Sequence, residues 1–160
     1  MLPRNMFELE KLRDECKSLV TTRASLSAGA AVIPLPGVDI GADIALLIEM
    51  IKNINKKFGL SKEQIDDLDP QTKQLILVAV TSIGSEMIGK FITKQLILQI
   101  LKRLGIRLAA KSIAKYIPIL GSAVAATISF GAMKLVGNSH VDDCFDVAKK
   151  TLIARDLSPN

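Results

Sequence analysis

Apolar residues recur three or four positions apart along most of this 160-residue chain, and this spacing constrains the fold more than any other feature. The clearest case is the segment 37–58, which has apolar residues at Ile40, Ile44, Leu47, Ile51, Ile54 and Phe58. Such a period is typical of amphipathic helices. Only 4% of the residues are aromatic, so the core must be aliphatic, which disfavours a β-sandwich. We therefore predict an all-α fold.

Proline, glycine and capping residues predict where the helices begin and end. Two of the expected breaks rest on glycine: one at Gly105, and one at Gly137 with Asn138, after which Ser139 would cap the last helix. In chain order, the predicted helical segments cover residues 5–22, 24–33, 37–58, a short polar stretch opened by Ser61 and Gln64, 70–88 after Asp69, 89–115, 121–136 and 139–152.

These segments predict one bundle of eight or nine helices. Residues 1–160 should form a single domain, with its core over about 5–157 and a polar connector over about 59–69.

Two corners with the same spacing should join pairs of helices into hairpins. Ile33-Pro34-x-x-Gly37 and Ile117-Pro118-x-x-Gly121 each connect a small-residue segment to a long apolar helix. Proline ends a helix and restricts the residue before it, so each motif predicts a sharp turn. The residues expected to shape the two corners are Pro34, Pro36, Gly37, Asp39, Pro118 and Gly121.

Basic residues are segregated along the chain. The stretch 87–141 contains no Asp or Glu and eight basic residues, whereas the rest of the chain holds thirteen basic and sixteen acidic residues. Arg103, Arg107, Lys111 and Lys115 are spaced by four, which places them along one side of a helix. Such a helix is typical of proteins that bind anionic membranes, and the lack of interleaved aromatic residues disfavours nucleic acid. The predicted membrane or partner surface consists of Lys90, Lys94, Lys102, Arg103, Arg107, Lys111 and Lys115.

No group of side chains predicts catalysis. The segment 84–91 matches a phosphate-binding loop until Phe91, which lacks the hydroxyl that would hold Mg²⁺. Asp39 and Asp43 lie at the start of a predicted helix, where negative charge is favourable, and so do the aspartates that follow His140. With one histidine, no catalytic triad can be assembled. We therefore expect a protein without enzymatic activity, cofactor or metal.

The chain carries no sign of export. Acidic residues from Glu8 to Glu15 occupy the region where the apolar core of a signal peptide would lie. Cys16 and Cys144 are far apart, which favours two reduced, buried thiols in a cytoplasmic protein. The longest uncharged stretch, 116–133, is at the lower limit for spanning a bilayer and favours a buried helix.

Two stretches resemble the C-terminal helical region of the immunity-related, interferon-inducible GTPases. The first runs from Pro34-Leu-Pro36-Gly37 to Phe58-Gly59-Leu60, and the second from Ile117-Pro118-Ile-Leu-Gly121-Ser122 to the helix that begins at Asp142-Asp143. The resemblance covers roughly residues 20–153 and implies an all-helical domain. It also implies an amphipathic helix that directs the protein to intracellular membranes, and residues 90–115 occupy its place in the order of the chain. These residues contain no counterpart of the family's GTPase domain, so GTP hydrolysis is not implied.

The leading hypothesis is a non-catalytic helical module that associates peripherally with an intracellular membrane, or with a partner bound to it, through the basic segment. One alternative is a protein-interaction or oligomerisation domain, such as a homo-oligomer or the partner of another helical protein. Another is a pore-forming protein that inserts residues 116–136.

Overall fold

A computed structural model describes the backbone of residues 1–30, 39–112 and 122–157, and the side chains of residues 1–26, 44–103 and 130–157. Over these residues the chain forms helices and no strands, which confirms the all-α prediction for this part of the chain. The helices are α1 (Met6–Ala30), α2 (Asp39–Phe58), α3 (Lys62–Asp66), α4 (Pro70–Ile83), α5 (Lys94–Ser112) and α6 (Ser122–Asp156).

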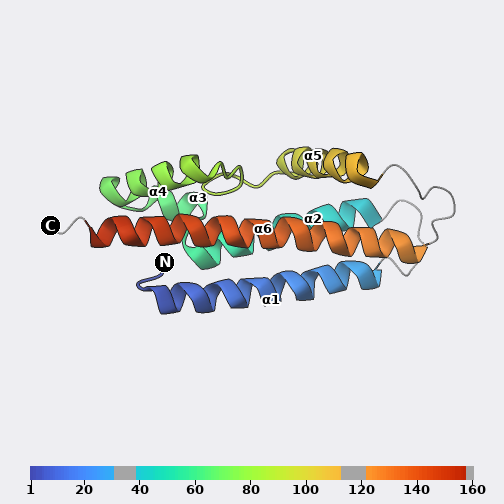
Figure 1. Ribbon diagram of the computed structural model, residues 1–160, viewed down its shortest axis with the longest axis horizontal. Helices are drawn as coiled ribbons and strands as arrows, with labels where there is room; N and C mark the ends of the chain where they lie inside the picture. Colours follow the sequence, from blue (N-terminus) through green and yellow to red (C-terminus); the bar gives the residue numbers. More distant parts are fainter. Residues whose placement is uncertain (31–38, 113–121, 158–160) are drawn as a thin grey trace.

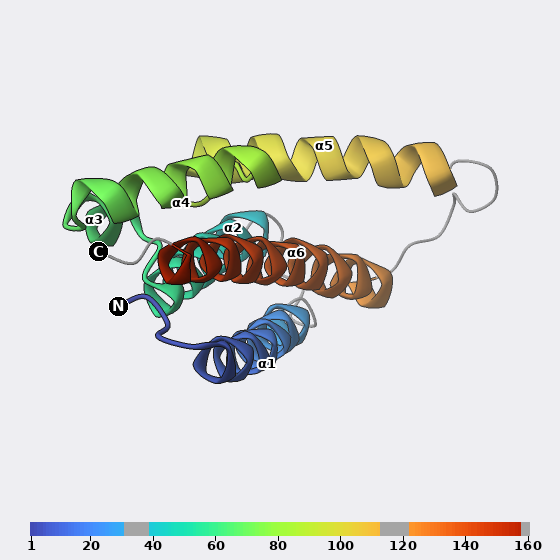
Figure 2. The same ribbon diagram turned by 60° about the vertical axis from the view of Figure 1, so that its left-hand side comes forward.

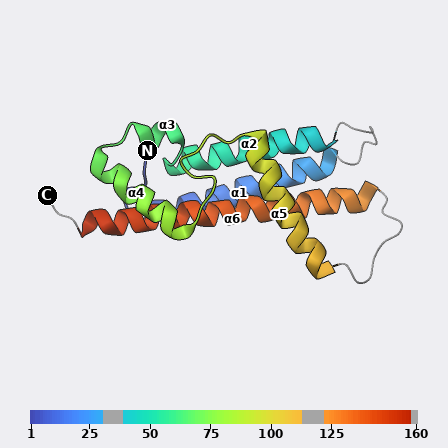
Figure 3. The same cartoon turned by 90° about the horizontal axis from the view of Figure 1, so that it is seen from above.

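Three long helices, α1, α2 and α6, pack against one another and enclose most of the core (Figure 1). Helices α4 and α5 form a further layer, separated from α1 by α2 and α6 (Figure 2). Seen from above, α5 crosses α2 and α6, and its C-terminal end extends beyond α6 (Figure 3). The largest fully buried side chains include Leu9, Val20, Met50, Ile51, Ile54, Phe58, Ile97, His140 and Val147.

Local capping interactions fix the connection between α2 and α4, as the sequence predicts. The Ser61 hydroxyl accepts a hydrogen bond from the Gln64 N–H at 3.3 Å, and the Gln64 side chain accepts one from the Ser61 N–H at 3.3 Å. Asp69 Oδ1 accepts from the Thr72 N–H at 2.8 Å, with Pro70 as the first residue of α4. These caps satisfy N–H groups that the first helical turn leaves unpaired. The predicted polar connector 59–69 therefore contains the short helix α3.

Several predicted helix boundaries are wrong. Helix α5 runs through Gly105, and α6 continues through Gly137 and Asn138, so Ser139 lies inside a helix. Helix α1 is continuous across the two segments predicted for its range. Helix α4 ends before Gly84, which has φ +75°, and the chain becomes helical again only at α5. The described residues form six helices, fewer than the eight or nine predicted for the whole chain.

Gly137 permits a close approach of three helices. A Cβ at this position would lie 2.7 Å from Cγ1 of Val20 on α1 and 2.8 Å from Cε of Met50 on α2. The close packing offsets the cost of glycine in a helix interior, which is about 1 kcal/mol relative to alanine. Gly137 is thus a contact residue, and this is why its presence does not end α6.

The two predicted corners cannot be compared with the structure. Pro34, Pro36, Gly37, Pro118 and Gly121 lie outside the described residues, while Asp39 is the first residue of α2. Residues 116–121 of the proposed inserting arm also lie outside them. Within the described ranges, no helix has both the length and the apolar character needed to cross a bilayer.

We predict that Gly137→Ala destabilises the protein although alanine favours helix formation. The new methyl group would overlap Val20 and Met50, and overpacking of this kind costs about 1–3 kcal/mol. The measurement is the free energy of unfolding in urea. Gly131→Ala on the same helix is the matched control, because a Cβ there meets nothing within 4 Å and should leave the stability unchanged or raise it. Equal effects of the two substitutions would contradict the close approach at Gly137.

Candidate binding surface

The loop 84–93, between α4 and α5, is attached to the core at several points. Asn55 Nδ2 donates to the Met87 carbonyl oxygen at 3.0 Å, and the Gly89 N–H donates to the Leu60 carbonyl oxygen at 3.2 Å. The side chains of Met87, Ile88 and Ile92 are buried. Because the loop is held from inside, Lys90 and Phe91, which follow Gly89, face solvent, and Phe91 is 65% exposed.

This loop contains the near-match to a phosphate-binding loop. The segment before it is helix α4, whereas the phosphate-binding motif requires a strand there. The structure therefore agrees with the rejection of a P-loop NTPase site at residues 84–91.

Helix α5 lies on the outer side of the bundle and carries most of the residues of the predicted basic surface. Thr93 caps it by accepting the Leu96 N–H at 3.2 Å, and the buried Ile97 fastens its first half to the core beside α2. Lys94 and Lys102 are exposed, and Leu98, which lies between them, is 42% exposed. The first half of α5 thus presents an apolar inner side and a basic outer side.

Arg103 has a carboxylate partner that the charge pattern does not predict. Its guanidinium donates to Glu86, the last acidic residue before the acid-free stretch. Arg103 is thus partly neutralised, although it is exposed.

The structure places the remaining predicted surface residues as follows. Arg107 and Lys111 lie within α5, in one continuous helix with Arg103, and Lys115 lies outside the described residues. A four-residue step advances about 40° beyond one full turn of an α-helix, so the basic positions wind gradually around α5. Lys90 belongs to the loop and not to the helix.

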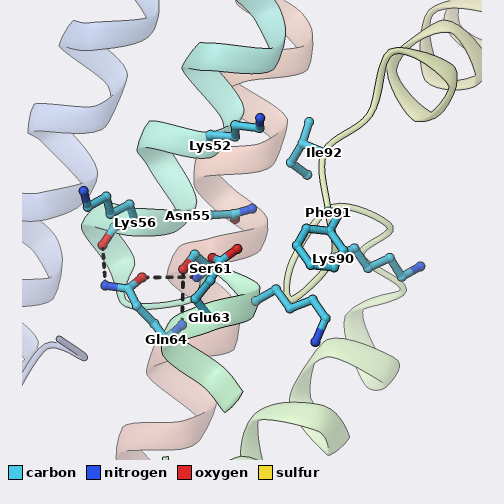
Figure 4. Close-up of a pocket in the computed structure, with 10 residues that line it drawn as sticks. Lys52, Asn55, Lys56, Ser61, Glu63, Gln64, Lys90, Phe91 and Ile92 are labelled. Atoms are coloured by element: carbon cyan, nitrogen blue, oxygen red, sulfur yellow. Dashed lines mark hydrogen bonds between the residues drawn. The ribbon is translucent and has the colours of Figure 1, made fainter. Parts of the chain in front are cut away.

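Lys90 instead lies beside lysines from earlier in the chain. A pocket of about 430 Å³ opens between α2, α3 and the loop (Figure 4). Asn55 and Lys52 of α2 lie on one side of it, and Phe91 and Ile92 on the other (Figure 4). The pocket is lined by Lys52, Asn55, Lys56, Ser61, Lys62, Glu63, Gln64, Lys90, Phe91 and Ile92.

Two acidic groups accompany these lysines. Lys62 Nζ lies 2.5 Å from Asp66 and 5.5 Å from the centre of the Phe91 ring. The hydrogen bond from Lys62 lowers the pKa of Asp66. Hydrogen bonds from its own backbone N–H and from Ser61 lower the pKa of Glu63, which is therefore a carboxylate at neutral pH. The pocket lining still carries more positive than negative charge.

The sequence analysis did not identify Lys52, Lys56 and Lys62 as site residues. Lys52 and Lys56 are four apart in α2, a spacing that indicates a shared face. Nothing in the sequence relates that face to Lys90, because the Asn55 and Gly89 hydrogen bonds that join the segments are tertiary contacts.

Behind the pocket lies a buried polar cluster. His140 Nε2 is 2.9 Å from Asn55 Oδ1, and the Cys144 thiol lies 3.6 Å from each of these atoms. Burial lowers the pKa of His140 to about 3 and raises that of Cys144, so the imidazole and the thiol are both neutral. Asp142 points elsewhere and pairs with Arg13 at 2.7 Å. Both cysteines are free and buried, as predicted.

The chain is similar to part of two curated proteins. It is 26% identical over 147 residues to interferon-inducible GTPase 5 of Rattus norvegicus, covering 91% of this chain and 32% of that protein. It is also 26% identical over 147 residues to interferon-inducible GTPase 5 of Bos taurus, covering 91% of this chain and 31% of that protein. The chain thus spans about a third of the length of these relatives, which supports the resemblance to part of such a protein. No family model matches the chain, and no solved structure matches it significantly.

We predict that acid destabilises the fold through His140. Its pKa is about 3 in the folded protein against 6.5 for the ordinary group, so between these values the unfolded chain binds a proton that the folded chain excludes. Stability should therefore fall as the pH drops below about 6.5, by roughly 2 kcal/mol between pH 7 and pH 5 from this group alone. Urea unfolding at both pH values measures the loss. His140→Gln should lose less stability over the same range, and an equal loss in both proteins would contradict the assignment.

Proposed function

We propose that this chain is a non-catalytic helical module that binds an anionic membrane surface peripherally, through the loop 84–93 and helix α5, in the cytoplasm. The observation that carries the proposal is the stretch 87–141, which holds eight basic residues and no acidic ones. Lys90, Lys94 and Lys102 are exposed members of this stretch.

The position of α5 supports this use. The helix lies in the outer layer of the bundle, and its C-terminal end extends past α6 (Figure 3). A surface can therefore approach α5 without displacing α1, α2 or α6. Each Lys or Arg close to an anionic membrane contributes about 1 kcal/mol of binding free energy, so a few basic residues suffice for reversible association.

The two relatives are named as GTPases, but the chain matches about a third of their length. The sequence contains no complete phosphate-binding motif, which is the reason for proposing a module without catalytic activity.

The test is co-sedimentation with liposomes of phosphatidylcholine alone or mixed with phosphatidylserine. We expect binding to the anionic liposomes that weakens with added salt, because exposed charges are screened. Arg107→Gln combined with Lys111→Gln should lower the partition coefficient roughly thirtyfold, since two charges of about 1 kcal/mol each are lost.

The matched control is Lys11→Gln combined with Lys149→Gln, which removes two exposed lysines from α1 and α6. It changes the net charge by the same amount but should leave membrane binding nearly intact. Binding that ignores lipid charge, or equal losses in the two double variants, would contradict the proposal.

A second candidate function is self-association or docking to a helical partner, which the outer side of α4 favours. Its neighbouring residues Leu77 and Val78 are 54% and 62% exposed. Contiguous exposed apolar side chains are typical of protein contacts. Light scattering would distinguish the two candidates, because a stable dimer that ignores lipid favours this one.

A further inference from the structure

We propose that the pocket between α2, α3 and the loop 84–93 binds an organic ligand with two or more phosphate groups. Inositol polyphosphates and phosphoinositide headgroups share this chemistry. The inference does not depend on membrane binding by α5, because Lys52, Lys56 and Lys62 lie outside the acid-free stretch of the chain.

The first support is the convergence of lysines from three separate segments. Lys52 and Lys56 come from α2, Lys62 from α3 and Lys90 from the loop, and all four line one pocket of about 430 Å³. Like charges brought together repel one another, and a polyanion would replace this repulsion with attraction.

The second support is that three of the four pocket lysines have no carboxylate partner in the part of the chain whose side chains are described. Among the same described residues, Lys52, Lys56 and Lys90 form no ion pair. These ammonium groups are thus available to an external anion.

The third support is the rigidity of the pocket walls. The Asn55 and Gly89 hydrogen bonds join the loop to α2 and to the start of α3, and the buried Ile92 closes the inner end. A site that is already formed loses little conformational entropy on binding. Phe91 supplies an apolar wall beside the lysines, so an organic phosphate fits the lining better than a free inorganic ion (Figure 4).

The carboxylates shape the site without cancelling its charge. Lys62 pairs with Asp66, but an ammonium group has three hydrogen atoms to donate and can also bind a phosphate oxygen. Glu63 is the one acidic residue in the lining, and its charge opposes an anion. Glu63→Gln should therefore tighten the binding of a phosphate ligand.

The experiment is titration calorimetry of the whole chain with inositol hexakisphosphate at moderate ionic strength. We expect saturable binding that weakens roughly tenfold or more in the double variant Lys52→Gln, Lys62→Gln, because charge-assisted hydrogen bonds are lost. Urea unfolding of each variant shows whether it is folded. If the double variant does not fold, Lys52→Gln alone and Glu63→Gln, with their opposite expected effects, provide the test.

Two control variants test whether the loss of binding is specific to the pocket lysines or follows from any loss of positive charge, including that of α5. Lys11→Gln with Lys149→Gln, and Arg107→Gln with Lys111→Gln, each remove the same charge as the pocket double variant and should retain binding. An absence of saturable binding, or equal weakening in all three double variants, would overturn the proposal. If the unaltered protein binds the soluble ligand but does not bind phosphatidylserine liposomes, membrane binding by α5 is refuted and the pocket proposal stands.

The source of the phosphate follows from a second pair of measurements. Phosphatidylcholine vesicles with phosphatidylinositol 4,5-bisphosphate should recruit the α5 double variant through the pocket if the ligand is a lipid headgroup, and soluble inositol hexakisphosphate should then compete. Binding of the soluble compound without vesicle recruitment assigns the pocket to a free inositol phosphate. Both results support a phosphate site.

Discussion

The hydrogen bonds of the buried Asn55 side chain connect the core to the loop that carries Lys90, and so fix the position of this lysine relative to α2. Asn55 is 2% exposed, its amide donates to the Met87 carbonyl oxygen of the loop, and it lies 2.9 Å from His140 Nε2 of α6. A buried polar group left without its partner costs about 1–3 kcal/mol, so α2, α6 and the loop are held in one mutual arrangement. Lys52 lies almost one helical turn before Asn55, and Lys90 lies three residues after Met87. The same amide therefore brings together lysines that are distant in sequence.

The sequence predicts those parts of the fold that depend on local interactions. The capping box at Ser61 and the start of α4 after Asp69 involve hydrogen bonds within three residues, and both are found as expected. The role of Gly137 could not be predicted from its neighbours in the sequence. Glycine often follows the end of a helix, but here it faces Val20 and Met50 from two other helices, and no local pattern distinguishes the two roles.

The same distinction applies to the surface. A run of basic residues is visible in the sequence, and Lys94 and Lys102 are exposed in the structure. The pairing of Arg103 with Glu86 and the grouping of Lys90 with lysines of α2 and α3 arise from tertiary contacts, so charge counting along the chain could not find them. The acid-poor stretch is thus only part of the positive surface, because the remainder of the chain, although net acidic, supplies three lysines to the pocket.

These two basic regions differ in physical kind. Successive charges of α5 spaced by four residues are about 6 Å apart along an open helix, a geometry that suits an extended anionic surface and is readily screened by salt. The pocket gathers its lysines beside an apolar wall formed by Phe91 and Ile92, so several positive charges can attract one compact anion together. Only Lys90 belongs both to the predicted membrane surface and to the pocket. Because the other residues are distinct, either region can lose its charge while the other keeps its own, and binding to an extended surface can be separated from binding to a compact phosphate ligand.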